Sequence, residues 1–218
     1  MLYGKLKFPR RVLAAIVLSA LSMGLQTVNA APKKKAAPKV KVACVGNSIT
    51  YGTGIQDREH FSYPVQLQNM LGDKYLVGNF GKPGATLLNH GHRPYMKQEE
   101  YKQAMAFKGD IAVIHLGIND TDPRNWPNYR DEFVKDYLSL MDSLRSANPK
   151  VRFILANITP IAHRHPRFIS GTKQWHDEIQ EAIKVVARVS GAELIDFHAP
   201  LYPYPNLLPD AIHPNAEG

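Results

Sequence analysis

The sequence predicts an α/β fold, a single domain built on a parallel β-sheet. Short apolar runs alternate along the chain with longer segments of helical periodicity, which is the pattern of repeated βαβ units. The apolar runs are almost uninterrupted by polar residues, as expected of strands in a sheet that is covered on both faces. We find no internal repeat that would indicate a solenoid.

Five apolar runs are predicted to form the strands. The clearest contains the sequence IAVIHL, and the first ends at Gly46. In chain order the runs span residues 41–46, 75–80, 110–116, 151–158 and 192–197. Sites in parallel sheets gather beyond the carboxyl ends of the strands, so functional residues are expected in the segments that follow these runs.

Four segments between the strands are predicted to be helical. In residues 129–147, five apolar side chains fall on one face of a helix, namely Phe133, Tyr137, Leu140, Met141 and Leu144. Residues 172–190 form another helix, and Gly191 follows it as a stop signal. Residues 63–71 and 95–107 complete the set.

The first 30 residues are predicted to be a secretory signal peptide. Basic residues that include Arg10 and Arg11 precede an apolar run over residues 12–25, and Ala30 ends a segment with cleavage-site spacing. The run is short for a membrane span, so an uncleaved anchor helix is the less favoured alternative and no stable membrane anchor is expected. We expect an exported protein, periplasmic or secreted, with a basic linker over residues 31–40 and one domain over residues 41–218.

The formal net charge of +8 comes from the N-terminal segment. Residues 1–41 hold nine of the 27 Lys and Arg residues and none of the 19 Asp and Glu residues, so the remainder carries a formal charge of −1. A nearly neutral domain has no broad field to attract a phosphate backbone, and nucleic acid is therefore not an expected partner. The single cysteine, Cys44, cannot form an internal disulfide and is expected to be a small buried side chain.

Ser48, Asp210 and His213 are the candidate catalytic residues. Ser48 directly follows the first strand, where its hydroxyl becomes a useful nucleophile if a base lies beside it. Asp210 and His213 are three residues apart, so the carboxylate can orient one imidazole nitrogen and leave the other to accept the Ser48 proton. Taken singly, Ser48 could instead be a helix N-cap, and the Asp–His pair could be a surface turn.

Gly84 and Asn119 are candidates for an oxyanion hole. Gly84 follows the second strand and offers a backbone N–H, while Asn119 ends the third strand region and offers a side-chain amide. Together with the N–H of Ser48 they supply three donors, as acyl transfer requires. Asn119 alone could equally cap a turn.

These segments resemble the SGNH (GDSL-like) hydrolase family. GNSIT around Ser48 resembles the GDSI/L nucleophile block, NFGKPG with Gly84 resembles N-x-G-x-S-G, GIND with Asn119 matches G-x-N-D, and DAIHPN with His213 matches D-x-x-H-P. The resemblance spans essentially the whole predicted domain. It implies a three-layer α/β/α sandwich with a five-stranded sheet of order 2-1-3-4-5. It also implies ester hydrolysis by a Ser-His-Asp triad without metal or other cofactor.

The sequence departs from the family pattern at three places. Asn47 stands where the family has Asp, and Pro83 stands where Ser is common before Gly84. Relatives continue into a helix after the HPN segment, so a C-terminal helix is expected to be missing here. The α/β-hydrolase fold is rejected, because Thr50 occupies the last position of G-x-S-x-G and the Asp and His share one turn.

Two further patterns are weak. The segment that begins with Gly52 and Gly54 lacks the third glycine of a dinucleotide-binding loop. The His-x-His pairs at residues 90–92 and 163–165 lack carboxylate or cysteine partners at metal-ligand spacing, so no metal is expected.

The substrate is predicted from resemblance alone. The patterns GNSITYG and SYPVQLQNMLGDKY resemble the sialate O-acetylesterase-like branch, which implies removal of O-acetyl groups from sialic acid or another glycan. Arg124 is a candidate for binding a sugar carboxylate, and Trp126 for the rim of a pocket, although each could be an ordinary loop or core residue. Two alternatives stay open: a lysophospholipase or thioesterase on the same scaffold, and a non-catalytic glycan-binding module. The sequence does not predict the oligomeric state.

Overall fold

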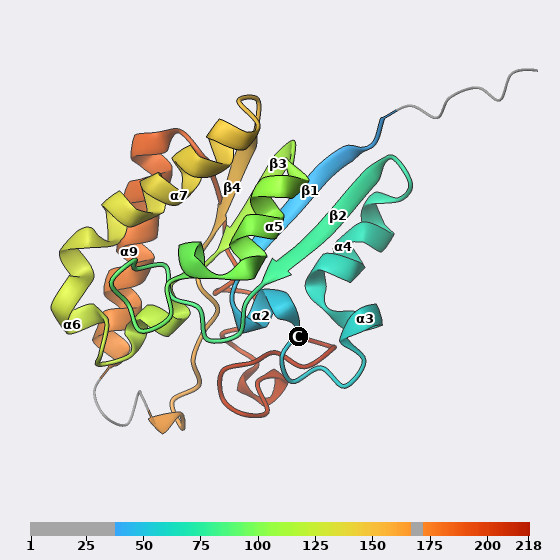
Figure 1. Cartoon of the computed structure of the whole chain (residues 1–218). Coiled ribbons are helices and arrows are strands. Elements are labelled where there is room, and N and C mark those ends of the chain that lie inside the picture. The colour runs from blue at the N-terminus through green and yellow to red at the C-terminus, as the bar shows by residue number, and fades with distance from the viewer. Residues whose placement is uncertain (1–37, 167–171) are drawn as a thin grey trace, which may run out of the picture. The chain divides into compact units, whose positions relative to one another are not determined.

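A parallel sheet of five strands organises the residues that the computed structural model describes, 38–166 and 172–218 (Figure 1). The strand order is β2-β1-β3-β4-β5, and every pairing is parallel. The strands are β1 (Val40–Gly46), β2 (Tyr75–Gly81), β3 (Ile111–His115), β4 (Arg152–Ala156) and β5 (Glu193–Ile195). The predicted sheet and its order are thus confirmed. The predicted signal peptide and most of the predicted linker lie outside the described residues.

Three helices cover one face of the sheet: α5 (Glu99–Phe107), α7 (Phe133–Ala147) and α9 (Lys173–Ser190). The five apolar residues predicted to share a face of α7 are all buried. They pack with Ile179 and Ile183 of α9 and with strand residues such as Ile114 in the main core. Each fully buried side chain of this size contributes about 1.5–3 kcal/mol to folding, so loss of any one of them should destabilise the protein.

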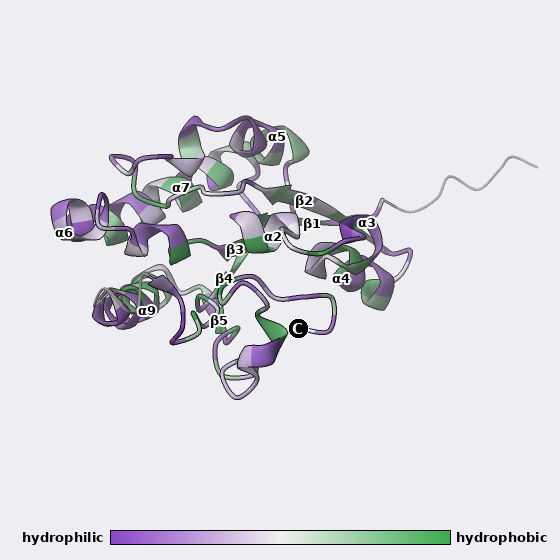
Figure 2. Cartoon of the chain, turned by 90° about the horizontal axis from the view of Figure 1, so that it is seen from below, coloured by the Kyte–Doolittle hydropathy of each residue, from purple (hydrophilic) through white to green (hydrophobic). Residues whose placement is uncertain are grey.

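The opposite face is covered by α4 (Tyr63–Leu71), which follows the short helix α3 (Arg58–Phe61). Figure 2 shows α5 and α7 on one side of the strands and α4 on the other. Beneath α4, Cys44 is fully buried between Val42 and Val113 and forms no disulfide among the described residues. The result is the expected three-layer α/β/α arrangement.

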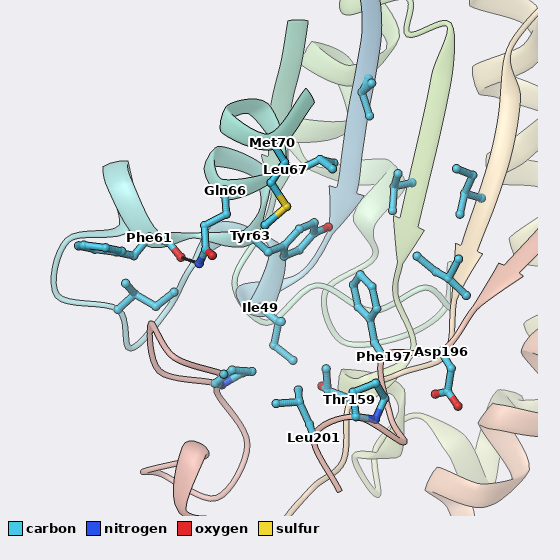
Figure 3. A pocket seen from close by; sticks show the side chains of 18 of the residues that line it. Ile49, Phe61, Tyr63, Gln66, Leu67, Met70, Thr159, Asp196, Phe197 and Leu201 are labelled. Carbon is cyan, nitrogen blue, oxygen red and sulfur yellow. Dashed lines mark hydrogen bonds between the residues drawn. The ribbon is translucent and has the colours of Figure 1, made fainter. Parts of the chain in front are cut away.

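An apolar groove of about 640 Å³ lies beside α4 on this second face (Figure 3). Its floor includes Val113, Ile154 and Ile195 of the sheet, and its walls include Leu67 of α4 and Phe197 beyond β5. Among the described residues, α4 therefore leaves part of this face of the sheet uncovered.

Two predicted helices are interrupted. The segment predicted as one helix over residues 129–147 consists of α6 (Trp126–Tyr129), the 3-10 turn η3 (Arg130–Glu132) and α7. The segment over residues 95–107 is divided at Gln98, whose extended backbone (ψ 160°) separates the 3-10 turn η1 (Tyr95–Lys97) from α5. Apolar periodicity continues across such tight turns, so it does not reveal the break.

The last strand is shorter than predicted. It ends at Ile195 because the Asp196 side chain turns the chain, its Oδ1 accepting the backbone N–H of His198 at 2.8 Å and of Ala199 at 3.1 Å. The remaining short elements are α2 (Ser48–Tyr51) and the 3-10 turns η2 (Ile118–Thr121) and η4 (Pro205–Leu207). No helix in the described ranges is both long and apolar enough to cross a membrane.

Candidate active site

Ser48 is the first residue of α2, directly beyond the end of β1. Gly46 permits this abrupt turn, because a Cβ there would collide with the side chain of Thr50 and the carbonyl oxygen of His115. The N-cap of α2 is Asn47, whose Oδ1 accepts the N–H of Ile49 at 3.0 Å. The capping role considered for Ser48 is therefore taken by its neighbour.

Ser48, His213 and Asp210 form one hydrogen-bonded chain. Ser48 Oγ lies 2.8 Å from His213 Nε2, although the two residues are 165 positions apart. On the other side of the ring, His213 Nδ1 lies 2.6 Å from Asp210 Oδ2. A carboxylate only accepts, so Nδ1 carries the imidazole proton and Nε2 keeps the lone pair that faces the serine hydroxyl.

A tight turn holds Asp210 against His213. Asp210 Oδ1 accepts the backbone N–H of Ile212 at 3.0 Å and of His213 at 2.7 Å. Burial disfavours ionisation of this carboxyl, but hydrogen bonds from the backbone and imidazole of His213 and from Ile212 outweigh it and hold the pKa of Asp210 below its ordinary value. The group is thus an ionised acceptor at neutral pH.

Ala211, within this turn, has a left-handed backbone with φ of 72°, which non-glycine residues adopt at a cost. Its N–H donates to the carbonyl of Leu208, and its own carbonyl accepts the N–H of Ala162, both at 2.8 Å. Ala162, Leu208 and Ala211 also form a small buried cluster. These contacts fix the turn that carries the Asp–His pair.

Gly84 and Asn119 lie on neighbouring loops beyond β2 and β3. Gly84 has φ of 75°, and a Cβ there would lie 3.0 Å from Nη1 of Arg93. The amide of Asn119 donates one hydrogen to the carbonyl of Ala85 at 2.9 Å, which leaves its second hydrogen available. Among the described residues, no hydrogen bond engages the N–H of Ser48 or of Gly84. These donors are available to an incoming oxygen.

The structure contradicts the role expected of Trp126 and weakens the one expected of Arg124. Trp126 is only 3% exposed, its ring packs 5.4 Å from that of Phe133, and its N–H donates to Glu178 at 2.6 Å. These contacts place the ring in the core and not at the rim of a pocket. Arg124 is exposed, but its guanidinium binds both oxygens of Asp122 at 2.9 Å, so its charge is already neutralised by a neighbour.

The first of the two His-x-His pairs is engaged by neighbours. His90 Nδ1 lies 2.7 Å from Glu132 Oε2, and His92 donates its backbone N–H to Asn125 at 3.0 Å. Across residues 38–166 and 172–218, no three His, Cys, Asp or Glu side chains come together as a metal site would require.

Sequence reasoning assigned no role to Asp120 or Asn125, which are both fully buried beside Asn119. Asn125 donates its amide to the carbonyl of Asn119 at 2.9 Å, and Asp120 accepts from the loop that follows Gly84. Asp120 is the last residue of the GIND segment, but its hydrogen-bond partners are the backbone N–H groups of Leu87 and Leu88. Any residue except proline has a backbone N–H, so the sequence contains no pattern that would predict these bonds.

The sequence is similar to a family of known hydrolases and to one characterised esterase. Residues 44–218 match the GDSL-like lipase/acylhydrolase family. An acetylxylan esterase of Xylanibacter ruminicola is 39% identical over 208 residues, a match that covers 86% of this chain and 42% of that protein. The chain thus spans about two fifths of the length of this curated relative.

Solved structures share the fold at low sequence identity. A crystal structure of an acetyl xylan esterase superposes with a TM-score of 0.61 at 20% identity, covering 82% of this chain and 93% of that one. A carbohydrate acetylesterase from Sinorhizobium meliloti superposes with a TM-score of 0.58 at 19% identity, covering 82% and 92%. These likenesses establish the fold, and the match over residues 44–218 establishes the family: the chain belongs to the GDSL-like lipase/acylhydrolases.

Proposed function

We propose that this protein is a serine esterase that hydrolyses O-acetyl esters of carbohydrates. The observation that carries the proposal is the hydrogen-bonded chain from Ser48 through His213 to Asp210. A serine hydroxyl is a weak nucleophile at neutral pH, and an adjacent imidazole with a free lone pair activates it.

In the first step, Ser48 Oγ attacks the ester carbonyl carbon while its proton passes to His213 Nε2. Asp210 stabilises the imidazolium that forms. The carbonyl oxygen gains the negative charge and is stabilised by the N–H groups of Ser48 and Gly84 and by the amide of Asn119. The intermediate then collapses, and the departing sugar oxygen takes the proton from His213, which leaves an acetyl group on Ser48.

In the second step, water attacks the acetyl carbonyl and gives its proton to His213. The same donors stabilise the second tetrahedral intermediate. Its collapse breaks the bond to Ser48 Oγ, which recovers the proton from His213, and acetic acid is released. Each step uses one proton transfer in each direction, so the enzyme returns to its starting state.

The substrate class is supported by the acetylxylan esterase of Xylanibacter ruminicola, which is similar over 86% of this chain. We therefore take acetylated xylan as the first substrate to test and O-acetylated sialic acid as the second. Arg124, which was expected to bind a sugar carboxylate, is paired with Asp122, and the second substrate is supported by the sequence resemblance alone.

A long-chain acylhydrolase is the alternative on the same scaffold. The 640 Å³ groove includes Ile49 and Thr53, close in sequence to the nucleophile, but none of the three proposed triad residues is among the described residues that line it. Pro214 and Asn215, which directly follow His213, also line the groove, so the comparison of acetyl esters with long-chain esters decides between the two acyl classes. A glycan-binding module without activity is the other alternative, and it predicts sugar binding with no acetate release.

The test is acetate release from acetylated xylan by the wild type and by Ser48→Ala. We expect the substitution to lower kcat by about 10⁴-fold or more, with an unchanged circular dichroism spectrum. Adding His213→Ala should cause little further loss, because the residues act as a unit. Equal rates for wild type and Ser48→Ala would exclude Ser48 as the nucleophile. Faster cleavage of nitrophenyl palmitate than of nitrophenyl acetate would favour the long-chain alternative.

We also propose that the protein is exported. The support is the basic, apolar and small-residue pattern of residues 1–30. N-terminal sequencing of the mature protein should give Ala31 as its first residue, and an intact N-terminus would contradict the prediction.

A further inference from the structure

The segment after Gly84 is buried without belonging to a helix or a strand. Ala85, Thr86, Leu87 and Leu88 are each at most 1% exposed. Buried backbone N–H groups must find partners, and those of Leu87 and Leu88 face no neighbouring strand. The path of this segment, and with it the orientation of the Gly84 N–H, depends on what supplies those partners.

Asp120 supplies them. Its Oδ2 accepts the N–H of Leu87 and its Oδ1 the N–H of Leu88, both at 2.9 Å, and the side chain is completely buried. Both oxygens of one carboxylate thus hold two consecutive residues of the loop. Such charge-assisted bonds are stronger than those between neutral groups.

Asn119, the residue before Asp120, also binds the segment that follows Gly84. Asn119 donates its amide to the carbonyl of Ala85 at 2.9 Å, and Asn119 and Asp120 both belong to the short turn η2. The N–H of Asp120 itself donates to the carbonyl of Gly117 at 3.0 Å, which fixes η2 against the end of β3. The turn η2 therefore carries one oxyanion donor, the Asn119 amide, and also holds the backbone that follows the second donor, the Gly84 N–H.

We propose that Asp120 is a positioning residue whose ionised carboxylate holds residues 85–88, so that the Gly84 N–H and the Asn119 amide converge on the same oxygen. This inference rests on the proposed esterase function. It assigns to Asp120 an effect on kcat, because the donors matter most when charge develops on the carbonyl oxygen.

The ionisation of this carboxyl adds a pH dependence. Burial raises the pKa of Asp120 to about 7, against the hydrogen bonds from Leu88, Leu87 and its own backbone, and with a further contribution from Asp136. Asp136 of α7 is the charged group that faces it, and its Oδ2 accepts the N–H of Asn89 at 2.7 Å. A protonated carboxyl cannot accept two N–H bonds equally well, so the loop is held less firmly as the pH falls through this range.

The experiment compares kcat and KM across pH for wild type, Asp120→Asn and Asp136→Asn, with the exposed Asp142→Asn as the matched control. We expect Asp120→Asn to lower kcat by about tenfold to a hundredfold with little change in KM, because an amide accepts only one of the two bonds. The acid limb of the wild-type kcat profile should contain the ionisation of Asp120, and the profile of Asp120→Asn should lack it. Asp136→Asn removes a like charge and should move the limb to lower pH.

A wild-type kcat and pH profile in Asp120→Asn would overturn the inference, as would a loss confined to KM. If Asp120→Asn does not fold, the pH profile of Asp136→Asn is the test. An acid limb of its kcat profile at the same pH as in wild type would contradict the role of Asp120. Failure of the proposed function looks different, because wild type and Asp142→Asn would then release no acetate at any pH.

Discussion

Asp210 determines which nitrogen of His213 carries the proton. Its Oδ2 lies 2.6 Å from Nδ1, and its Oδ1 is occupied by two backbone N–H groups of the same turn. The carboxylate therefore cannot rotate away without breaking three bonds. The imidazole is held in one tautomer and one orientation, with Nε2 toward Ser48.

Asp210→Asn should test this role. An amide at this position no longer selects the tautomer with the proton on Nδ1, so kcat at neutral pH should fall by about 10³- to 10⁴-fold. Acetate release measures the effect, and Asp142→Asn serves again as the exposed control. A kcat equal to that of wild type would contradict a role for Asp210 in orienting His213.

The residues of the site differ in how far the sequence could predict them. Ser48, Asp210 and His213 each had an ordinary structural alternative when taken singly, and they were predicted as a set because their segments lie beyond strand ends and together resemble the family motifs. Trp126 was expected at a pocket rim but is buried, and Arg124 was expected to bind a sugar carboxylate but pairs with Asp122. The direction of a side chain depends on neighbours such as Glu178 and Asp122 that the pattern does not reveal.

Among the elements, the turn over residues 208–213 is expected to be strained, because it contains a non-glycine residue in the left-handed region. Ala211 has φ of 72°, so Ala211→Gly should leave the free energy of unfolding unchanged or raise it slightly. Ala211→Val should lower it by about 1 kcal/mol or more, because a β-branched side chain fits this backbone poorly. Urea denaturation measures both.

Ala182→Gly, in the interior of α9, is the control for the glycine substitution. It should lower the free energy of unfolding by about 1 kcal/mol, the ordinary effect of glycine in a helix. An equal loss in Ala211→Gly would show that the turn is not strained.

The long elements were predicted well and the short ones were not. All five strands and the cores of α4, α5, α7 and α9 follow from apolar runs and periodicity. Four-residue helices such as α2 and α6 contain barely one turn, which is too short for a periodic signal. Their formation depends on contacts such as the Asn47 cap, and α2 is the element that presents Ser48.

At the scale of the whole molecule, the accessibility of the Cys44 thiol measures how often the sheet opens. Cys44 is the single cysteine of the chain and is fully buried under α4, and burial raises the pKa of its thiol to about 12 against a hydrogen bond from Tyr63. A thiol reagent should modify the native protein only as fast as the sheet opens, and the unfolded protein at once. Colorimetric labelling in increasing urea measures this, and rapid labelling without denaturant would contradict it.

The groove beside α4 is not a uniform hydrocarbon surface. Thr159 lines it and is 2% exposed, and its hydroxyl has no partner among the described residues. That oxygen is already shielded from solvent, so an occupant of the groove would meet other polar groups instead, such as the side chains of Gln66 and Asn215. An amphiphilic molecule, with an apolar part for the floor of the groove and a polar part for these side chains, should therefore bind this surface better than an aliphatic molecule of equal size.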